Sequence, residues 1–522
     1  MNLLIEEWIP VRPLPAGAMD KIGLKQLLCG DGKWEVCLPR DDMELAAIQL
    51  LISITQVLLT PKTPEELKTR IAKPLPESEY DAAIKPYAGW FQLDHPKYPF
   101  MQVRGVVAKI ITPMDKLFAG ITGSENCCFV NEPNVVSQIC SGCAAIALFN
   151  QASCSPSFGG GSEGGFKNGL RGSAPITTLV QGNHLRQTVW LNVLNETNLL
   201  QIIPWHKETA SQMPTWIEPI KERATIKAQQ IGLFRGLFWQ PAHVELLTPE
   251  ASAQCACCGV TEGKMYSGFY KAQFGFNVSG TWPHPHSPRI MDSKNEGEKF
   301  LSYKFSTPSW TQLSRFVVRQ QMDDTNIEGQ QPAAVVMQMK DIMKRNAEKL
   351  HLLVGGYRNN QAKILERRHD VFTLNHGWEA DTKTIKYLVE QGLSYKEALY
   401  SAVTLFMKGR DDKKRKLQSL KGIGPKIKLN QVAVAQFYRR TEPTLENTLA
   451  KIDFSAPDIE LTRMRTALRK ITAEMFEEVT MPYMNDPELI RTAAVSKLIL
   501  RKHLNELEPQ QNKGGSDGTG TP

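Results

Sequence analysis

The stretch 455-SAPDIELTRMRTALRKITAEMFEEV-479 decides the fold of the C-terminal part of the chain. Its apolar residues recur at steps of three and four positions: Leu461, Met464, Leu468, Ile471, Met475 and Val479. This period places them along one face of an α-helix, which becomes stable when that face is buried. Ser455 is a candidate N-cap, and Asp458 and Glu460 suit the positive end of the helix dipole. The stretch therefore predicts an amphipathic helix that packs against other helices.

Three neighbouring segments carry the same helical pattern, at residues 382–409, 429–452 and 488–504. The last follows Asp486, an expected N-cap, and Pro487 at the first helical position. Four amphipathic helices with short connections predict a four-helix bundle over residues 376–507. The tail, residues 508–522, contains the low-complexity stretch QQNKGGSDGTGTP and is expected to be disordered.

Residues 1–375 have a different texture. Short β-branched and aromatic runs alternate with Pro and Gly, as in 174-APITTLV-180, 187-QTVWLNVL-194 and 274-FGFNVSGTW-282. The apolar run 45-LAAIQLLISITQVLL-59 is interrupted by polar residues and too short to span a membrane, so it predicts a buried helix. We expect a large mixed α/β domain followed by the bundle, and thus the α+β class.

Composition places few limits on function. The 522 residues include 62 Lys and Arg against 54 Asp and Glu, a net charge of +8 that permits a polyanionic partner without demanding one. The opening MNLLIEEWIP lacks the basic region of a signal peptide. We therefore expect a soluble, cytoplasmic protein with no membrane partner.

Cysteine spacing carries the clearest chemical signal. Cys140 and Cys143 form CSGC, and Cys255 and Cys258 lie in CACC. Two Cys-x-x-Cys pairs supply four thiolates, which suit a structural zinc and leave no open position for catalysis. Cys257 makes the second pair ambiguous, although Cys255 with Cys258 has the better spacing. The alternative is four buried thiols that never meet.

The stretch 355-GGYRNNQAKILERRHD-370 predicts a tight turn that holds three amide side chains, Asn359, Asn360 and Gln361, at its tip. An ordinary surface turn is the alternative. Residues 159-GGGSEG-164 fit a dinucleotide fingerprint formally, but no strand precedes them and no Lys-Ser/Thr follows, so a flexible linker is favoured. In 282-WPHPHSP-288, His284 and His286 offer metal ligands, although a rigid structural loop is favoured.

Several motifs together resemble a known family. They are the opening 1-MNLLIEEWIPVRP-13 with 38-LPRDDMELAA-47, then 128-CFVNEPNVVSQICSGCAAIALFNQASCSPSFGGG-161, 165-GFKNGLRG-172, 236-GLFWQPAHVEL-246, the His-containing loop and the amide-rich turn. In this order and spacing they resemble the large subunit of the type I-E CRISPR surveillance complex, Cascade (the CasA family), from Met1 to about Leu507.

The resemblance implies recognition of a short protospacer-adjacent motif (PAM) from the DNA minor groove, followed by opening of the duplex and R-loop formation. The family's glutamine wedge corresponds to Gln361, flanked by Asn360 and Ala362. Its glycine loop corresponds to Gly159, Gly160 and Gly161, here followed by an apparent insertion, residues 162–165.

The resemblance also implies a sensing loop and a lysine finger, and each assignment has an alternative. Phe129 and Asn131 belong to a loop associated with PAM sensing and the guide 5′ end, although a core Phe is the alternative reading of Phe129. The place of the family's lysine finger falls on the uncharged Gln273. Lys271, two residues earlier and on the same face of a strand, is a candidate to replace it.

The implied partners are a guide CRISPR RNA, PAM-bearing double-stranded DNA, the backbone, guide 5′-end and small subunits of Cascade, and a helicase–nuclease that acts in antiviral defence. The basic run 408–428 offers Lys413, Lys414, Arg415 and Lys416 for the displaced strand, or is a solvated loop. No catalytic constellation emerges, so we expect a non-enzymatic subunit. The alternative is a free-standing, zinc-stabilised DNA-processing enzyme, because 420-LKGIGPKI-427 resembles a helix-hairpin-helix turn.

Overall fold

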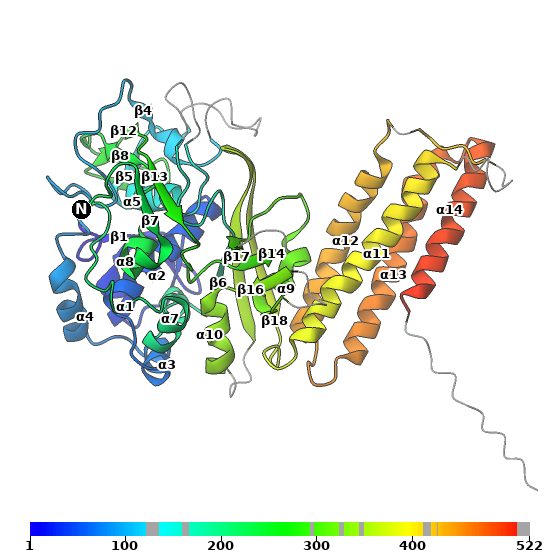
Figure 1. The fold of residues 1–522 in the computed structure, drawn as a ribbon, viewed down its shortest axis with the longest axis horizontal. Helices are drawn as coiled ribbons and strands as arrows, with labels where there is room; N and C mark the ends of the chain where they lie inside the picture. Colours follow the sequence, from blue (N-terminus) through cyan, green and yellow to red (C-terminus); the bar gives the residue numbers. More distant parts are fainter. Residues whose placement is uncertain are drawn as a thin grey trace, which may run out of the picture. The chain divides into compact units, whose positions relative to one another are not determined.

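The computed structural model describes residues 1–121, 135–158, 166–292, 297–322, 328–343, 349–410, 419–424 and 426–508. The chain divides into two compact units (Figure 1). Unit 1 comprises Met1–Ser306 and Arg315–Thr373, and unit 2 comprises Thr307–Ser314 and Leu374–Pro522. Within the described ranges, every helix is too short or too polar to cross a membrane.

Unit 1 contains small sheets of two or three strands. The three-stranded sheets have the strand orders β2-β1-β3, β4-β12-β8, β15-β14-β16 and β18-β17-β6, and the two-stranded ones pair β10 with β9, β11 with β5 and β13 with β7. The strands are β1 (Glu7–Pro13), β2 (Asp20–Gly23), β3 (Trp34–Val36), β4 (Thr112–Pro113), β5 (Ile139–Cys140), β6 (Thr177–Val180), β7 (Ala224–Lys227), β8 (His243–Leu246), β9 (Ala253–Gln254), β10 (Thr261–Glu262), β11 (Met265–Tyr266), β12 (Gly268–Ala272), β13 (Phe276–Ser279), β14 (Arg289–Asp292), β15 (Glu298–Phe300), β16 (Glu328–Gln331), β17 (Leu350–Asn360) and β18 (Lys363–Leu374).

Two buried helices, α2 (Asp41–Leu58) and α5 (Ser141–Ser153), pack together in the core of unit 1. The prediction of a buried helix over residues 45–59 is confirmed. Of the shorter helices, α6 (Leu185–Leu191) and α8 (Leu233–Leu237) contact α2. The others are α1 (Leu24–Cys29), α3 (Pro64–Ala72), α4 (Glu77–Ile84), α7 (Glu196–Ile202), α10 (Ala334–Met343) and α9 (Leu313–Val317), which crosses the boundary between the two units. Residues 187–194, a run of β-branched and aromatic residues, lie mostly in the helix α6. His184 caps this helix, since its ring accepts a hydrogen bond from the Gln187 N–H.

The longest strands, β17 and β18, form a hairpin with Gln361 and Ala362 as its two turn residues. Gly355 and Gly356, expected to form the turn, lie instead within β17. A Cβ added to Gly355 would stand 2.5 Å from Leu45 Cδ2 of α2, and one added to Gly356 would stand 2.8 Å from the Pro175 carbonyl oxygen. The two glycines therefore allow the hairpin to approach the core closely.

Unit 2 contains four long helices that run side by side (Figure 1): α11 (Thr382–Lys408), α12 (Leu429–Lys451), α13 (Asp458–Thr480) and α14 (Pro487–Glu506). The α+β class with a C-terminal helical region is confirmed. Asp486 caps α14 as expected, since its carboxylate accepts a hydrogen bond from the Glu488 N–H. The expectation for Ser455 is wrong: its hydroxyl donates to Asp453 at 2.6 Å, and α13 starts three residues later.

Candidate functional site

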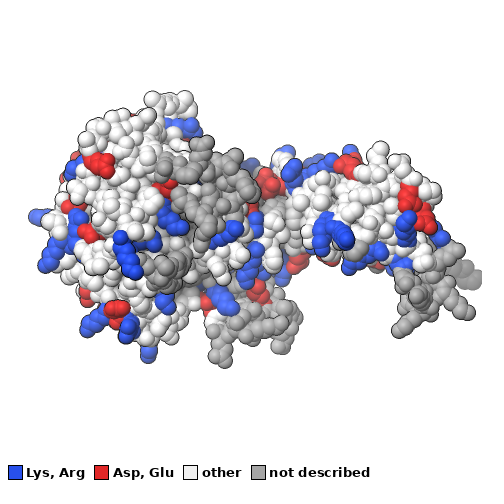
Figure 2. Space-filling view, turned by 90° about the horizontal axis from the view of Figure 1, so that it is seen from above, with Lys and Arg blue, Asp and Glu red and all other residues white. Residues whose placement is uncertain are grey.

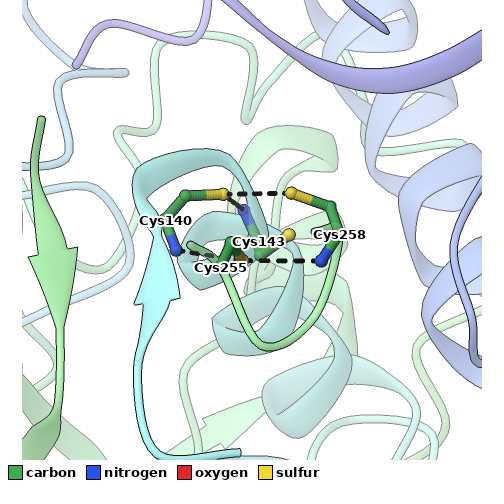
Figure 3. Close-up of side chains that lie close together, drawn as sticks. All are labelled: Cys140, Cys143, Cys255 and Cys258. Carbon is green, nitrogen blue, oxygen red and sulfur yellow. Dashed lines mark hydrogen bonds between the residues drawn. The ribbon is translucent and has the colours of Figure 1, made fainter. Parts of the chain in front are cut away.

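The four cysteines of the two Cys-x-x-Cys pairs meet in one buried group, here called the Cys cluster (Figure 3). Their sulfur atoms all lie within 4.8 Å of one another. Cys140 ends β5 and caps α5, while Cys255 and Cys258 lie in the tight loop between β9 and β10. Although the pairs are 115 positions apart, the pairing of β5 with β11 places Met265 opposite Cys140 and brings them together.

The donor set of the Cys cluster fits a tetrahedral divalent cation. Zinc–sulfur bonds of about 2.3 Å in a tetrahedron require sulfur–sulfur distances of about 3.8 Å, and Cys140 Sγ lies 3.7 Å from Cys258 Sγ. Cys257 is buried nearby, and its N–H donates to Cys255 Sγ, but its own sulfur is not part of the cluster. The preference for Cys255 with Cys258 is confirmed.

The thiols of the Cys cluster interact electrostatically with one another and with a nearby lysine. Hydrogen bonds with Cys140 and Cys255 raise the pKa of the Cys143 thiol, whereas those with Cys140 and Cys143 lower the pKa of Cys255. The ionisation of each thiol therefore depends on its neighbours in the cluster. The ammonium group of Lys21 lies beside the cluster, with Nζ 3.1 Å from Cys140 Sγ, and it also forms an ion pair with Glu262.

The hairpin turn presents uncharged polar side chains, as the sequence predicts. Asn360 and Gln361 are exposed, and Gln361 has a φ of +54°, in the left-handed region. Asn359 differs from the expectation, because its side-chain amide donates to Ser173 Oγ at 2.8 Å and to the Gln361 carbonyl oxygen. A non-glycine residue in the left-handed region costs about 1 kcal/mol, so the turn holds Gln361 in a strained position.

A small cavity of about 30 Å³ lies at the base of the turn. Three separate segments line it: residues 116–120, residues 156–158 together with Gln151, and Ala362 with Ile364 of the hairpin. An added Cβ at Gly120 would stand 3.2 Å from Ile364 Cβ, so the first segment touches the hairpin closely. These segments lead directly into residues 122–134 and 159–165. Phe129, Asn131, Gly159, Gly160 and Gly161 themselves lie outside the described residues.

Lys271 lies on β12 with its Nζ 4.5 Å from the ring centroid of Phe166 and 5.6 Å from that of Phe158. These two rings flank residues 159–165 in the sequence, so Lys271 lies beside the base of the expected glycine loop. Gln273 is exposed and follows the end of β12 at Ala272. Because Gln273 lies outside the strand, the alternation of side chains along β12 does not place Gln273 on the same face as Lys271.

Arg171 closes the base of the same loop, a role that the sequence reasoning missed. Its guanidinium is buried and donates to the Ser153 carbonyl oxygen at 2.7 Å, and to Thr177 and Ser287 at 2.9 Å each. Ser153 ends α5, so Arg171 joins both ends of residues 154–170. A single charged residue between glycines, in 169-GLRG-172, is the signal that marks it.

The other candidates are the histidines of residues 282–288 and the basic run 408–428. His286 is fully buried, with Nδ1 3.2 Å from Gln49 Nε2, which fits a structural loop. The Gly424 N–H donates to the Met407 carbonyl oxygen at 3.0 Å and helps close α11, so this amide is not available for a phosphate. Lys413, Lys414, Arg415 and Lys416 fall outside the described ranges. On the face drawn in Figure 2, basic and acidic side chains of the described residues lie interspersed.

The chain is similar to known proteins in both sequence and structure. A model of the family described as CRISPR-associated protein Cse1 matches residues 2–475. The structure of Thermus thermophilus CasA (Cse1) is similar with a TM-score of 0.69 and 17% identity, over 97% of this chain and 100% of that one. Thermobifida fusca Cse1 is similar with a TM-score of 0.72 and 15% identity, over 97% and 98%. A chain of a CRISPR RNA-guided surveillance complex has a TM-score of 0.64 and 15% identity, over 96% and 99%.

Proposed function

The chain belongs to the family of CRISPR-associated protein Cse1, and from this premise we propose that it is the large subunit of a type I-E Cascade complex that recognises the PAM. It contacts PAM-bearing double-stranded DNA from the minor groove and inserts the hairpin turn at the neighbouring base pair. The displaced strand then passes over basic residues while the guide RNA pairs with the target.

The observation that carries this proposal is the convergence of three segments at the small cavity below Gln361. The minor groove displays mostly acceptors, which uncharged amides such as those of Asn360 and Gln361 can read without selecting a single sequence. Parting the first base step costs about 1–2 kcal/mol of stacking, and pairing with the guide returns a similar amount at each later step. A short, pre-strained turn is therefore sufficient to start the opening.

In this proposal the Cys cluster holds a structural zinc. All four positions of a tetrahedral ion are taken by Cys140, Cys143, Cys255 and Cys258, which excludes an open position for catalysis there. A structural ion contributes binding free energy to folding, on the order of 10 kcal/mol in small zinc peptides. Because Cys140 caps α5, and α5 ends at Ser153 beside the expected glycine loop, the metal would fix one end of the helix that supports the interface.

The proposal makes the protein a recognition subunit without an enzymatic activity of its own. It would assemble with a guide RNA and the other Cascade subunits in the cytoplasm and recruit the helicase–nuclease after the R-loop has formed. The rival is a free-standing DNA-processing enzyme. Incubating the pure chain with duplex DNA and divalent metals separates the two, since cleavage without partners would favour the rival.

The direct test replaces Gln361 in the assembled complex. A fluorescent base analogue at the first position beside the PAM reports opening of the duplex. Gln361→Ala should slow opening at least tenfold, whereas a target already melted at that position should be bound at the normal rate. The matched control is Gln26→Ala, which truncates an exposed glutamine on α1 of the same unit. Equal losses on intact and pre-melted targets would contradict the wedge role.

A further inference from the structure

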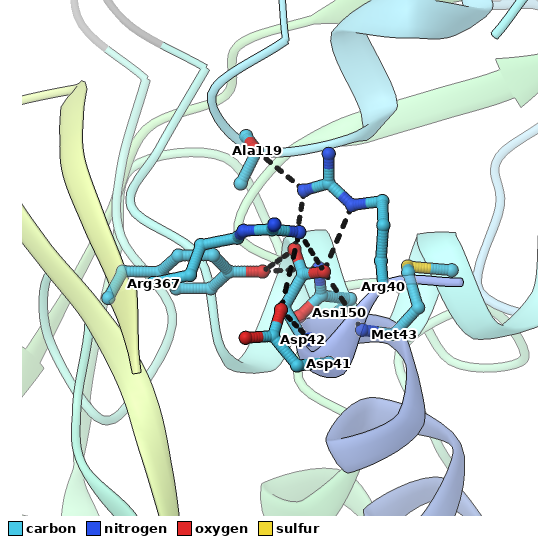
Figure 4. Close-up of polar contacts among 8 residues, drawn as sticks. Arg40, Asp41, Asp42, Met43, Ala119, Asn150 and Arg367 are labelled. Carbon is cyan, nitrogen blue, oxygen red and sulfur yellow. Dashed lines mark hydrogen bonds and ion pairs between the residues drawn. The ribbon is translucent and has the colours of Figure 1, made fainter. Parts of the chain in front are cut away.

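The carboxylate of Asp42, at the start of α2, joins both strands of the hairpin to the core (Figure 4). It is almost fully buried and accepts hydrogen bonds from the Tyr357 hydroxyl of β17 at 2.8 Å and from Arg367 Nη1 of β18 at 3.3 Å. Arg40 completes the group with Nη2 2.6 Å and Nε 3.0 Å from the same carboxylate. Burial opposes the charge on Asp42, yet Arg40 holds its pKa below the ordinary value.

The same group reaches two further parts of the candidate interface. Arg40 Nη2 donates to the Ala119 carbonyl oxygen at 2.9 Å, within the segment that lines the cavity and leads toward Phe129. The Tyr357 hydroxyl accepts a hydrogen bond from Asn150 Nδ2 of α5 at 2.8 Å. One buried carboxylate thus connects the hairpin, the cavity wall and, through Tyr357, the helix that begins at the Cys cluster.

The position of these bonds along the hairpin matters for the turn. Gln361 is four residues beyond Tyr357, which at about 3.3 Å per strand residue is about 13 Å. A small rotation of the strands at Tyr357 is therefore enlarged at the tip. Replacing a buried ion cluster by apolar side chains is often neutral for stability, so a role in fixing geometry has to be tested apart from stability.

We infer that Asp42, Tyr357 and Arg367 are positioning residues that fix the hairpin turn above the cavity and so set the place where Gln361 meets the DNA. The inference deepens the proposed function and rests on it for its consequence in DNA opening. Its structural part, that the three side chains restrain the turn, stands independently.

The structural part is tested on the full chain without DNA by hydrogen exchange. Tyr357→Phe removes only the hydroxyl and should make the amides of the turn, residues 361–363, exchange about tenfold faster, the factor that corresponds to the loss of a hydrogen bond to a charged group. Arg367→Gln, at a side chain that is 37% exposed, tests the second strand with little risk to folding. The control is Tyr80→Phe, which removes a buried hydroxyl that donates to the Leu4 carbonyl oxygen at 2.7 Å in the same unit.

The functional part is tested in the assembled complex by a double-mutant cycle with Gln361→Ala. If Tyr357 acts through the turn, Tyr357→Phe slows opening of intact duplex about tenfold, and the double variant opens no more slowly than Gln361→Ala alone. The inference would be overturned if the effects of Tyr357→Phe and Gln361→Ala on the opening rate multiplied in the double variant. It would also be overturned if the turn amides exchanged at the wild-type rate in both Tyr357→Phe and Arg367→Gln. If turn exchange rises while Gln361→Ala opens DNA normally, the restraint stands and the proposed function fails.

Discussion

Lys271 Nζ lies over the ring of Phe166 at 4.5 Å from its centroid, and over Phe158 at 5.6 Å, so one cation bridges the two aromatic residues that flank positions 159–165. Such an interaction contributes about 0.5–2 kcal/mol, depending on its exposure. It also keeps an ammonium beside the base of the expected glycine loop, two residues before Gln273, the position to which the family resemblance assigns a lysine finger.

We predict that Lys271, and not Gln273, supplies the cation that binds DNA. Lys271→Met should weaken binding of PAM-bearing duplex about tenfold and reduce the slope of log affinity against log salt by about 0.9, the value for one neutralised phosphate. Lys73→Met, at an exposed lysine of the same unit, is the control. Loss of affinity with Gln273→Ala but not with Lys271→Met would reverse the assignment.

The strain at Gln361 separates stability from function. Glycine adopts the observed φ of +54° without strain, so Gln361→Gly should gain about 1 kcal/mol of folding free energy at this position. It should lose a similar amount because glycine gives the unfolded chain more conformational freedom. Gln361→Gly should therefore melt at the temperature of the wild type and still open DNA slowly. Gln361→Val should lower the melting temperature, because a β-branched residue disfavours this φ. Normal opening by the glycine variant would show that the side chain is not needed.

Cys140→Ser should lower zinc content and thermal stability together, because it removes one ligand of the proposed zinc while the serine hydroxyl can still cap α5. Metal analysis of the purified chain and a thermal melt measure the two effects. Cys257→Ser is the matched control, since Cys257 is buried beside the Cys cluster but does not belong to it. Undiminished zinc in Cys140→Ser would remove the basis for this site.

The basic run between α11 and α12 is predicted to hold the displaced strand by binding its phosphates alone. Replacing Lys413, Lys414, Arg415 and Lys416 with Gln should reduce the salt slope of target binding, by about 0.7 for each phosphate of the single strand that is no longer neutralised. The control neutralises Lys470 and Lys502, two exposed lysines of α13 and α14. If both sets leave the slope unchanged, the run does not bind DNA.

Unit 1 should lose stability in acid through His286. Burial lowers the pKa of His286 from 6.5 to about 3, so the unfolded chain binds the proton more readily than the folded one. The stability is complete above pH 6.5 and is lost as the pH falls toward 3. Between pH 7 and pH 5 the loss is about 2 kcal/mol. Denaturant unfolding between pH 7 and pH 5 measures how the free energy of unfolding depends on pH. This dependence should be shallower in His286→Gln than in the wild type. If it is the same in both proteins, other groups cause the loss of stability.

Local patterns predicted much of the fold. The three-to-four period of Leu461, Met464 and Leu468 sufficed for α13, because a bundle helix is set by its own apolar face. The spacing of the cysteines predicted the Cys cluster across 115 positions, since few arrangements satisfy four thiols. The family resemblance drawn from the motifs is confirmed.

The failures have two physical origins, a competing local hydrogen bond at Ser455 and tertiary contacts at Gly355 and Asp42. Ser455 does not cap α13 because the Asp453 carboxylate, two residues earlier, takes its hydroxyl. Gly355 was assigned to the turn, whereas its packing against Leu45 depends on a helix some 300 positions away in the sequence. Asp42 escaped notice for the same reason, since its partner Tyr357 is 315 positions away.

The most direct test of the central claim is a site-specific photo-crosslink from position 361 in the assembled complex bound to PAM-bearing DNA. A photoreactive residue in place of Gln361 should crosslink to the base pair next to the PAM, while the same residue in place of Gln26 should give no crosslink there. Crosslinks from position 361 that fall on protein alone, or on DNA distant from the PAM, would contradict the account.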